Sequence, residues 1–174
     1  ATTEIYMVKD TLSLDDALPI WAEHLTEAEF YSASGDQIVP AAVTATGSQY
    51  PNTPENTLDG RTVDNSRWSV EVEFRGVELA LPTEGAVSAV GIAFPNGNAR
   101  RTQFDVFVSS DGVVWDKIIA DARSVEGTTD LHVYGSEVGA RRGRYVRVVP
   151  KFTQPVDTTG RVELSEITVY GPSD

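Results

Sequence analysis

The pattern of hydrophobic and polar positions changes character near residue 35. Within residues 12–30, apolar residues recur at helical spacing, namely Leu14, Leu18, Trp21 and Leu25. Beyond Gly35, short apolar runs alternate with polar residues and are separated by Gly, Pro, Asn and Asp. The pattern therefore predicts an acidic, partly helical extension over residues 1–36, followed by one all-β domain over residues 37–174.

In seven segments of this domain, apolar and polar residues alternate, as in strands with one apolar face. They are Val77–Leu81, Val87–Phe94, Gln103–Ser109, Val113–Ile119, Leu131–Tyr134, Arg144–Val149 and Val162–Tyr170. Pro95–Asn98 and Ser110–Gly112 are typical hairpin turns. No helical pattern that could serve as a parallel crossover lies between the strands. We therefore predict an antiparallel jelly-roll β-sandwich.

The composition and charge of the chain exclude several classes of function and site. The 174 residues carry 26 acidic and 14 basic side chains, for a net charge of −12. Such an acidic chain is not expected to bind nucleic acid or an anionic membrane, because phosphate binding needs clustered Lys and Arg. The absence of cysteine excludes disulfides and thiolate zinc sites. No apolar run is long enough to predict a membrane span.

No catalytic pattern stands out in the sequence. His24 and His132 are the only histidines, and neither GxSxG nor HExxH occurs. Carboxylate pairs such as Asp105 and Asp111 lie where turns and strands already explain them. We expect a chain that is not an enzyme.

The segment of residues 56–69 is unusually rich in oxygen donors. Its polar side chains include Asp59, Thr62, Asp64, Asn65 and Ser66. Such a loop can wrap a calcium ion, which takes six to eight oxygen ligands. Asp and Asn also form turns by bonding their own backbone, so a plain turn is the alternative.

Glu166 breaks the alternation of the last predicted strand. It shares its parity with Val162 and Leu164, whereas Ile167 and Val169 have the opposite parity. Either the strand carries a bulge near Glu166 or this carboxylate points inward. An inward carboxylate needs a partner, which could be a calcium ion shared with the Asp59 loop or the side chain of Arg67.

Five motifs, in this order, carry a family resemblance. They are NTLDGRTVDNSRWS, VSAVGIAF, GNARRTQFDVFVSSDGVVWDKI, GRYVRVVP and ELSEITVYG. Together they resemble the discoidin or coagulation factor 5/8 type C domain over about residues 37–174. Within it, they are similar to bacterial family 32 carbohydrate-binding modules, above all those attached to marine alginate lyases.

The resemblance implies a structural calcium ion and two framework aromatics. The implied calcium ligands are Leu58, through its carbonyl, together with Asp59, Ser66 and Glu166. Arg61 stands where the family often has a further acidic ligand, and Asp64 or the carbonyl of Thr62 is expected to replace it. Trp68 and Trp115 match framework aromatics and are expected in the core.

The resemblance also implies ligand contacts from loops at one end of the sandwich. The matching loops are Ser48–Glu55, Asn96–Arg101 and Lys151–Gly160, with the candidate ligand-binding residues Tyr50, Asn52, Asn98, Arg100, Lys151 and Phe152. Arg100 offers a planar fork of donors suited to a uronate carboxylate. A surface ion pair with Asp105 is its alternative role.

The resemblance implies a secreted bacterial binding module without catalytic activity. We expect a monomer that tethers a polysaccharide-degrading catalytic domain to its glycan, most readily an acidic polysaccharide such as alginate. Two alternatives stay open: a discoidin-like adhesion domain that binds a protein or cell surface, and a calcium-stabilised structural spacer.

Overall fold

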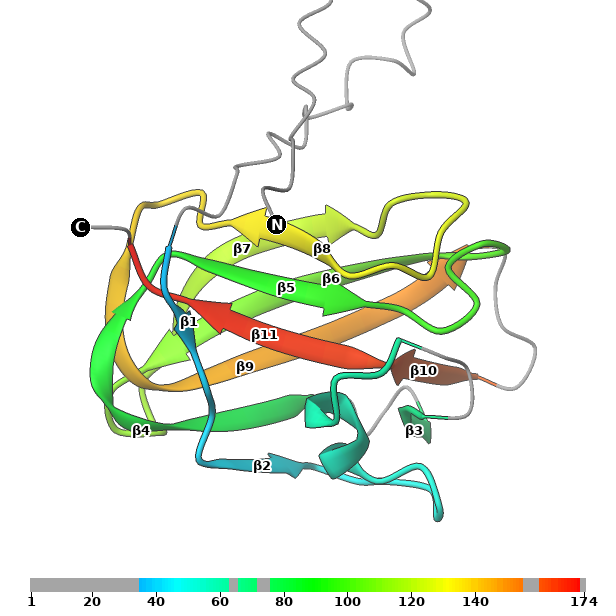
Figure 1. The fold of residues 1–174 in the computed structure, drawn as a ribbon, viewed down its shortest axis with the longest axis horizontal. Helices are drawn as coiled ribbons and strands as arrows, with labels where there is room; N and C mark the ends of the chain where they lie inside the picture. The colour runs from blue at the N-terminus through cyan, green and yellow to red at the C-terminus, as the bar shows by residue number, and fades with distance from the viewer. Residues whose placement is uncertain (1–34, 63–65, 72–75, 155–159, 173–174) are drawn as a thin grey trace, which may run out of the picture.

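The computed structural model describes residues 35–62, 66–71, 76–154 and 160–172 (Figure 1). The helix predicted within residues 12–30 lies outside the described residues. In the part of the chain that is described, no helix is long and apolar enough to cross a membrane.

The described residues form eleven strands and one short 3-10 helix, η2 (Pro54–Leu58). One sheet has the order β1 (Gln37–Ile38), β11 (Glu166–Tyr170), β5 (Ala89–Ala93) and β8 (His132–Gly135). A second sheet has the order β2 (Ala42–Ala45), β4 (Val77–Val87), β9 (Arg141–Gln154), β6 (Arg101–Ser109) and β7 (Asp116–Arg123). β10 (Arg161–Leu164) pairs with β3 (Trp68–Glu71).

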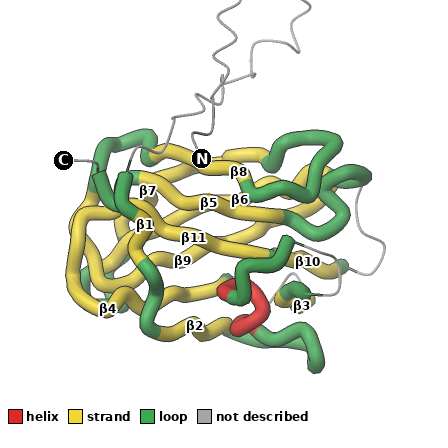
Figure 2. Tube along the Cα trace, in the orientation of Figure 1, coloured by secondary structure: helices red, strands yellow, loops and turns green. Residues whose placement is uncertain are grey.

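These sheets form two facing layers, with β10 and β3 at one end (Figures 1 and 2). Every strand pairing among the described residues is antiparallel. The prediction of an antiparallel jelly-roll β-sandwich is confirmed. The strands alternate as expected, since one face of each sheet is buried against the other layer.

The core lies between the two layers. Its largest fully buried side chains include Trp68, Phe104, Leu79 and Ile92. The Phe104 ring packs edge-on against Tyr134, with centroids 4.9 Å apart. Burial of these apolar surfaces stabilises the sandwich, and their close packing fixes how the two sheets sit on each other.

Trp68 has the predicted core position, but the prediction for Trp115 is wrong. Trp115 is half-buried on the outer face of the five-stranded sheet. Its ring lies 3.7 Å from the guanidinium carbon of Arg147, which also bonds Glu78 at 2.9 Å. The tryptophan therefore covers a sheet-surface ion pair, and its indole N–H donates to Gly112 O of the preceding turn at 3.1 Å.

The predicted turn at Ser110–Gly112 does form the hairpin between β6 and β7. Asp111 Oδ1 accepts the N–H groups of Val113 and Val114, both at 2.8 Å. These bonds extend the turn, so β7 begins at Asp116 and the predicted strand start at Val113 is wrong. Val113 is accordingly 79% exposed.

The turn predicted at Pro95–Asn98 is present, but it does not make a hairpin. Gly97 N donates to Phe94 O at 3.2 Å, and Asn96 adopts a positive φ of 60°. The turn leads from β5 in one sheet to β6 in the other. The alternation of apolar and polar residues predicts each strand, but it does not predict the sheet to which the strand belongs.

The predicted strand Val162–Tyr170 is divided at Ser165. Residues before the break pair with β3, and residues after it pair with β5. The break explains the change of parity: Leu164 and Glu166 are both buried, with Glu166 only 7% exposed. The pattern had left two alternatives, and the structure shows both a break in the strand at Ser165 and an inward carboxylate at Glu166.

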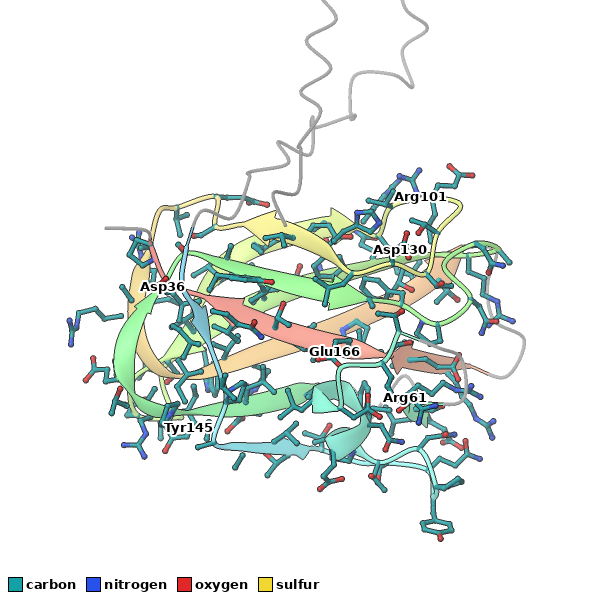
Figure 3. All side chains as sticks on the ribbon, viewed as in Figure 1. Asp36, Arg61, Arg101, Asp130, Tyr145 and Glu166 are labelled. Atoms are coloured by element: carbon teal, nitrogen blue, oxygen red, sulfur yellow. The ribbon has the colours of Figure 1, made fainter. Side chains whose placement is uncertain are left out.

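The described chain enters and leaves the sandwich at one end. Gly171 N donates to Asp36 O at 2.9 Å, and a Cβ on Gly35 would lie 1.8 Å from Gly171 O, so only glycine fits this approach. Figure 3 places Asp36 at one end of the sandwich and Arg61, Arg101 and Asp130 at the other.

Candidate functional site

Tyr50 lies on a loop that is firmly hydrogen-bonded to the sandwich. Its side chain is 89% exposed. On either side of it, Gln49 N donates to Ser69 O at 2.9 Å and Ser69 N donates to Asn52 O at 3.3 Å. The loop thus extends the edge of β3 and holds an aromatic ring in solvent, where it can cover the face of a ligand.

Two side chains beneath this loop strengthen its attachment. The buried Trp68 donates its Nε1–H to Gly47 O at 2.8 Å, and Asn56 Nδ2 donates to Pro51 O at 3.3 Å. Asn52 itself is half-buried. Such a loop loses little conformational freedom when a ligand binds, which favours affinity.

A hollow of about 240 Å³ opens beside the Tyr50 loop. It is lined by Ser48, Gln49, Val70, Glu71 and Arg161. Val70 is 6% exposed and packs in the hydrophobic core, whereas Ser48, Gln49 and Glu71 are exposed. Sequence reasoning missed this hollow, because it depends on the pairing of β10 with β3 and on the loop that bonds to β3.

The second predicted loop contains Asn98 and Arg100. Ala99 N and Arg100 N both donate to Asn96 O at 2.9 Å, which folds the loop tightly. Asn98 is exposed and Arg100 is half-buried. The loop lies at the same end of the molecule as the Tyr50 loop but follows β5, on another side of that end (Figure 1).

Backbone contacts hold this second loop against its neighbour. Gly127 N donates to Gly97 O at 3.2 Å. A Cβ on Gly97 would lie 2.1 Å from Thr128 O, so the two loops approach more closely than another residue would allow.

Lys151 and Phe152 lie near the end of β9. Phe152 is 41% exposed. The Lys151 Nζ is 2.8 Å from Asp105 Oδ1 and 2.5 Å from Asp121 Oδ1. The positive charge of Lys151 is therefore already paired within the chain.

Asp105, the alternative partner considered for Arg100, is held by lysines. Its carboxylate also accepts Lys117 Nζ at 2.8 Å and the Asp121 N–H at 2.7 Å. Burial raises the pKa of Asp105, but these hydrogen bonds and the one from Lys151 outweigh burial and hold the pKa below its ordinary value.

Asp59, Ser66 and Glu166 bring oxygen atoms together where η2 ends beside β11. Ser66 Oγ donates to Asp59 Oδ2, and Gly60 N donates to Glu166 Oε2 at 2.9 Å. Burial raises the pKa of Glu166 to about 7; the Gly60 N–H opposes this shift and the charge of Asp59 adds to it.

The other predicted calcium ligands are placed only in part. Leu58 packs against the core directly before Asp59, whereas Asp64 lies outside the described residues. Arg61 is exposed, and Arg67, the alternative partner of Glu166, pairs with Glu163 at 2.8 Å.

The donor set at this site fits calcium better than a softer metal. Among the described residues, no group of three or more His, Cys, Asp or Glu side chains could hold a metal. Two carboxylates and a hydroxyl nevertheless converge, and backbone carbonyls are common further ligands of calcium. Hard oxygen donors of this kind suit calcium and not zinc.

A family model described as "F5/8 type C domain" matches residues 41–164. The chain belongs to the F5/8 type C domain family. The prediction of a noncatalytic chain is confirmed, since F5/8 type C domains are binding modules. No curated protein matched the chain.

Several solved structures share the fold of this F5/8 type C domain. The family 32 carbohydrate-binding module of AlyQ, in complex with 4,5-unsaturated mannuronic acid, is 25% identical with a TM-score of 0.69 and covers 78% of this chain and 98% of that one. A pectin-binding module is 20% identical with a TM-score of 0.67, and the match covers 76% of this chain and 91% of that one.

A family 32 module of NanJ from Clostridium perfringens, in complex with galactose, shows the same fold at lower similarity. It is 14% identical with a TM-score of 0.58 and covers 77% of this chain and 98% of that one. A truncated AlyQ with this type of module and an alginate lyase domain is 24% identical with a TM-score of 0.70; 80% of this chain is covered. The F5/8 type C domain described here spans only 34% of that protein.

Proposed function

We propose that the chain is a noncatalytic carbohydrate-binding module that attaches a polysaccharide-degrading enzyme to an acidic polysaccharide, alginate before others. The observation that carries the proposal is Tyr50, 89% exposed on a loop bonded to β3. The AlyQ module supports an acidic glycan, because its described ligand, 4,5-unsaturated mannuronic acid, is a uronate sugar.

The arrangement of the molecule supports a tethering role. The chain passes Asp36 and Gly171 at the end opposite Arg61, Arg101 and Asp130 (Figure 3). A catalytic domain attached there would leave the Tyr50 loop free to reach a glycan. Weak binding would then suffice, because tethering raises the local concentration of the enzyme on its substrate. Such an enzyme would act outside a bacterial cell.

The proposed contacts divide between apolar and polar groups. Tyr50 and Phe152 would cover sugar faces, and the polar contacts would come from Asn52, Asn98 and Arg100. Arg100 would pair with a uronate carboxylate through its planar fork. Lys151 is the weakest candidate, because its ammonium group is already bound to Asp105.

Calorimetry with a mannuronate trisaccharide and with neutral mannotriose tests the proposal. We expect weak binding that prefers the uronate and falls as salt is added, because ions screen exposed charge pairs. Arg100→Ala should weaken uronate binding severalfold. Arg141→Ala is the matched control and should leave it unchanged, since this exposed arginine lies at the start of β9.

Two results of that experiment would count against an acidic glycan. One is a preference for the neutral sugar or for galactose, the ligand of the NanJ module. The other is equal binding by the Arg100→Ala and Arg141→Ala variants, which would remove the assigned role of Arg100.

We also propose that Asp59, Ser66 and Glu166 hold a structural calcium ion. The convergence of their oxygen atoms from the η2 loop and the last strand supports it. When bound, the ion would neutralise two neighbouring carboxylates and fasten the loop that follows η2 to β11. Asp64 and the carbonyl of Leu58 remain proposed ligands.

A further inference from the structure

Arg161 differs from every other half-buried Lys or Arg of the described residues. The others have partners: Arg67 with Glu163, Arg101 with Glu126, Arg147 with Glu78, Lys151 with Asp105, and Arg100 through a contact of its own. Within the described part of the chain, no hydrogen bond or ion pair engages the Arg161 guanidinium. The hydrogen-bond donors of this guanidinium are therefore open to a ligand.

Glu71 lies opposite Arg161 in the strand register. The two residues are Cα partners in the pairing of β10 with β3. Opposite charges in such positions commonly pair across strands. Here no ion pair forms between these described residues; instead, both line the hollow. The hollow thus offers a donor fork and a separate carboxylate acceptor.

The remaining lining suits a single sugar residue. The exposed side chains of Gln49 and Ser48 provide neutral hydrogen-bond donors and acceptors that suit the hydroxyls of a pyranose ring. Pockets for drug-sized ligands measure about 300–1,000 Å³. The hollow, at about 240 Å³, is smaller and has room for one residue of a longer chain. Its place beside Tyr50 would let neighbouring residues of the same chain continue over the aromatic ring.

We propose that the hollow is a subsite for one hexuronate residue, with the sugar carboxylate on Arg161 and ring hydroxyls donating to Glu71. A neutral sugar would leave the guanidinium unpaired, and an anion without hydroxyls would meet Glu71 with nothing to donate. A ligand that carries a carboxylate and hydroxyls on one ring satisfies both charges together. This assignment rests on the proposed function and names Arg161 as its main carboxylate contact.

Calorimetry on the full chain with the mannuronate trisaccharide tests the subsite. We expect Arg161→Ala to weaken binding at least tenfold and Arg161→Lys to recover part of the loss, because lysine keeps the charge but lacks the fork. Glu71→Gln should weaken binding severalfold. Arg144→Ala is the matched control, since this arginine is exposed on β9, and it should bind like the unaltered chain. Equal melting temperatures would show that each variant is folded.

The possible results distinguish a failure of the subsite proposal from a failure of the proposed function. If Arg161→Ala binds normally while Arg100→Ala does not, the subsite is wrong and the proposed function stands. If Arg161→Ala loses affinity for mannotriose as much as for the uronate, the hollow does not recognise the carboxylate. If the unaltered chain binds no uronate, both proposals fail.

Discussion

Asp105 shows how much a single buried carboxylate depends on its neighbours. It is 4% exposed, and Lys117, Lys151 and the Asp121 N–H hold its pKa below the ordinary value. In the unfolded chain the pKa returns to about 3.9. The ionised form therefore stabilises the fold above about pH 4, and this contribution is lost as the pH falls through the lower, folded-state pKa.

We expect Asp105→Asn to lower the free energy of unfolding by about 1–3 kcal/mol at pH 7, because bonds from two ammonium groups lose their charge. Urea unfolding at pH 7 and at pH 2 measures the effect. The difference from the unaltered chain should shrink at the lower pH. A constant difference at both values would mean that packing, and not charge, explains the loss.

Some residues of the candidate site could be predicted from the sequence and others could not. Glu166 was recognisable because its parity conflicts with that of its neighbours, and the structure buries it. Tyr50 was named through the family resemblance, and its loop is exposed. Nothing in the sequence pointed to Arg161 as a binding residue. Its candidate role depends on its position opposite Glu71 in a strand pairing, and local sequence patterns do not encode that pairing.

At the scale of elements, the β6–β7 turn depends on one glycine. Gly112 has a φ of +74°, whereas a Cβ there would meet the Tyr145 ring at an ordinary 3.7 Å. Gly112→Ala should therefore cost about 1–2 kcal/mol through backbone strain alone. Gly85→Ala is the control, because that position has no positive φ and open space around it. Thermal unfolding compares them, and equal melting temperatures would contradict the argument.

The strands themselves were mostly predictable, whereas their partners were not. Alternation located β5 and β6, but the turn between them crosses to the other sheet. The last predicted strand looked continuous, yet Ser165 divides it between β3 and β5. Short-range periodicity reports which face of a strand is buried, and sheet membership is decided by contacts between distant segments.

At the scale of the whole molecule, the proposed calcium ion would link the η2 loop to the last strand. An ion that binds only the folded chain stabilises it by about 2.7 kcal/mol at one hundred times its dissociation constant. Chelation with EDTA should then lower the melting temperature by about 5–10 °C for a domain of this size.

Asp59→Ala should abolish the response to EDTA, whereas Asp116→Ala, an exposed residue at the start of β7, should keep it. Metal analysis of the purified protein provides a second readout. A melting curve that EDTA leaves unmoved, together with no bound calcium, would reduce the Asp59 loop to an ordinary turn.

The hydrogen bond between Gly171 and Asp36 has a consequence for how the sandwich can be combined with other proteins. A polypeptide that enters at Asp36 leaves at Gly171 almost where it came in. The two ends of the sandwich are therefore adjacent. The sandwich could be inserted into a surface loop of another domain without moving the two ends of that loop apart. Recombination could thus move it between hosts as readily as it could append it to them.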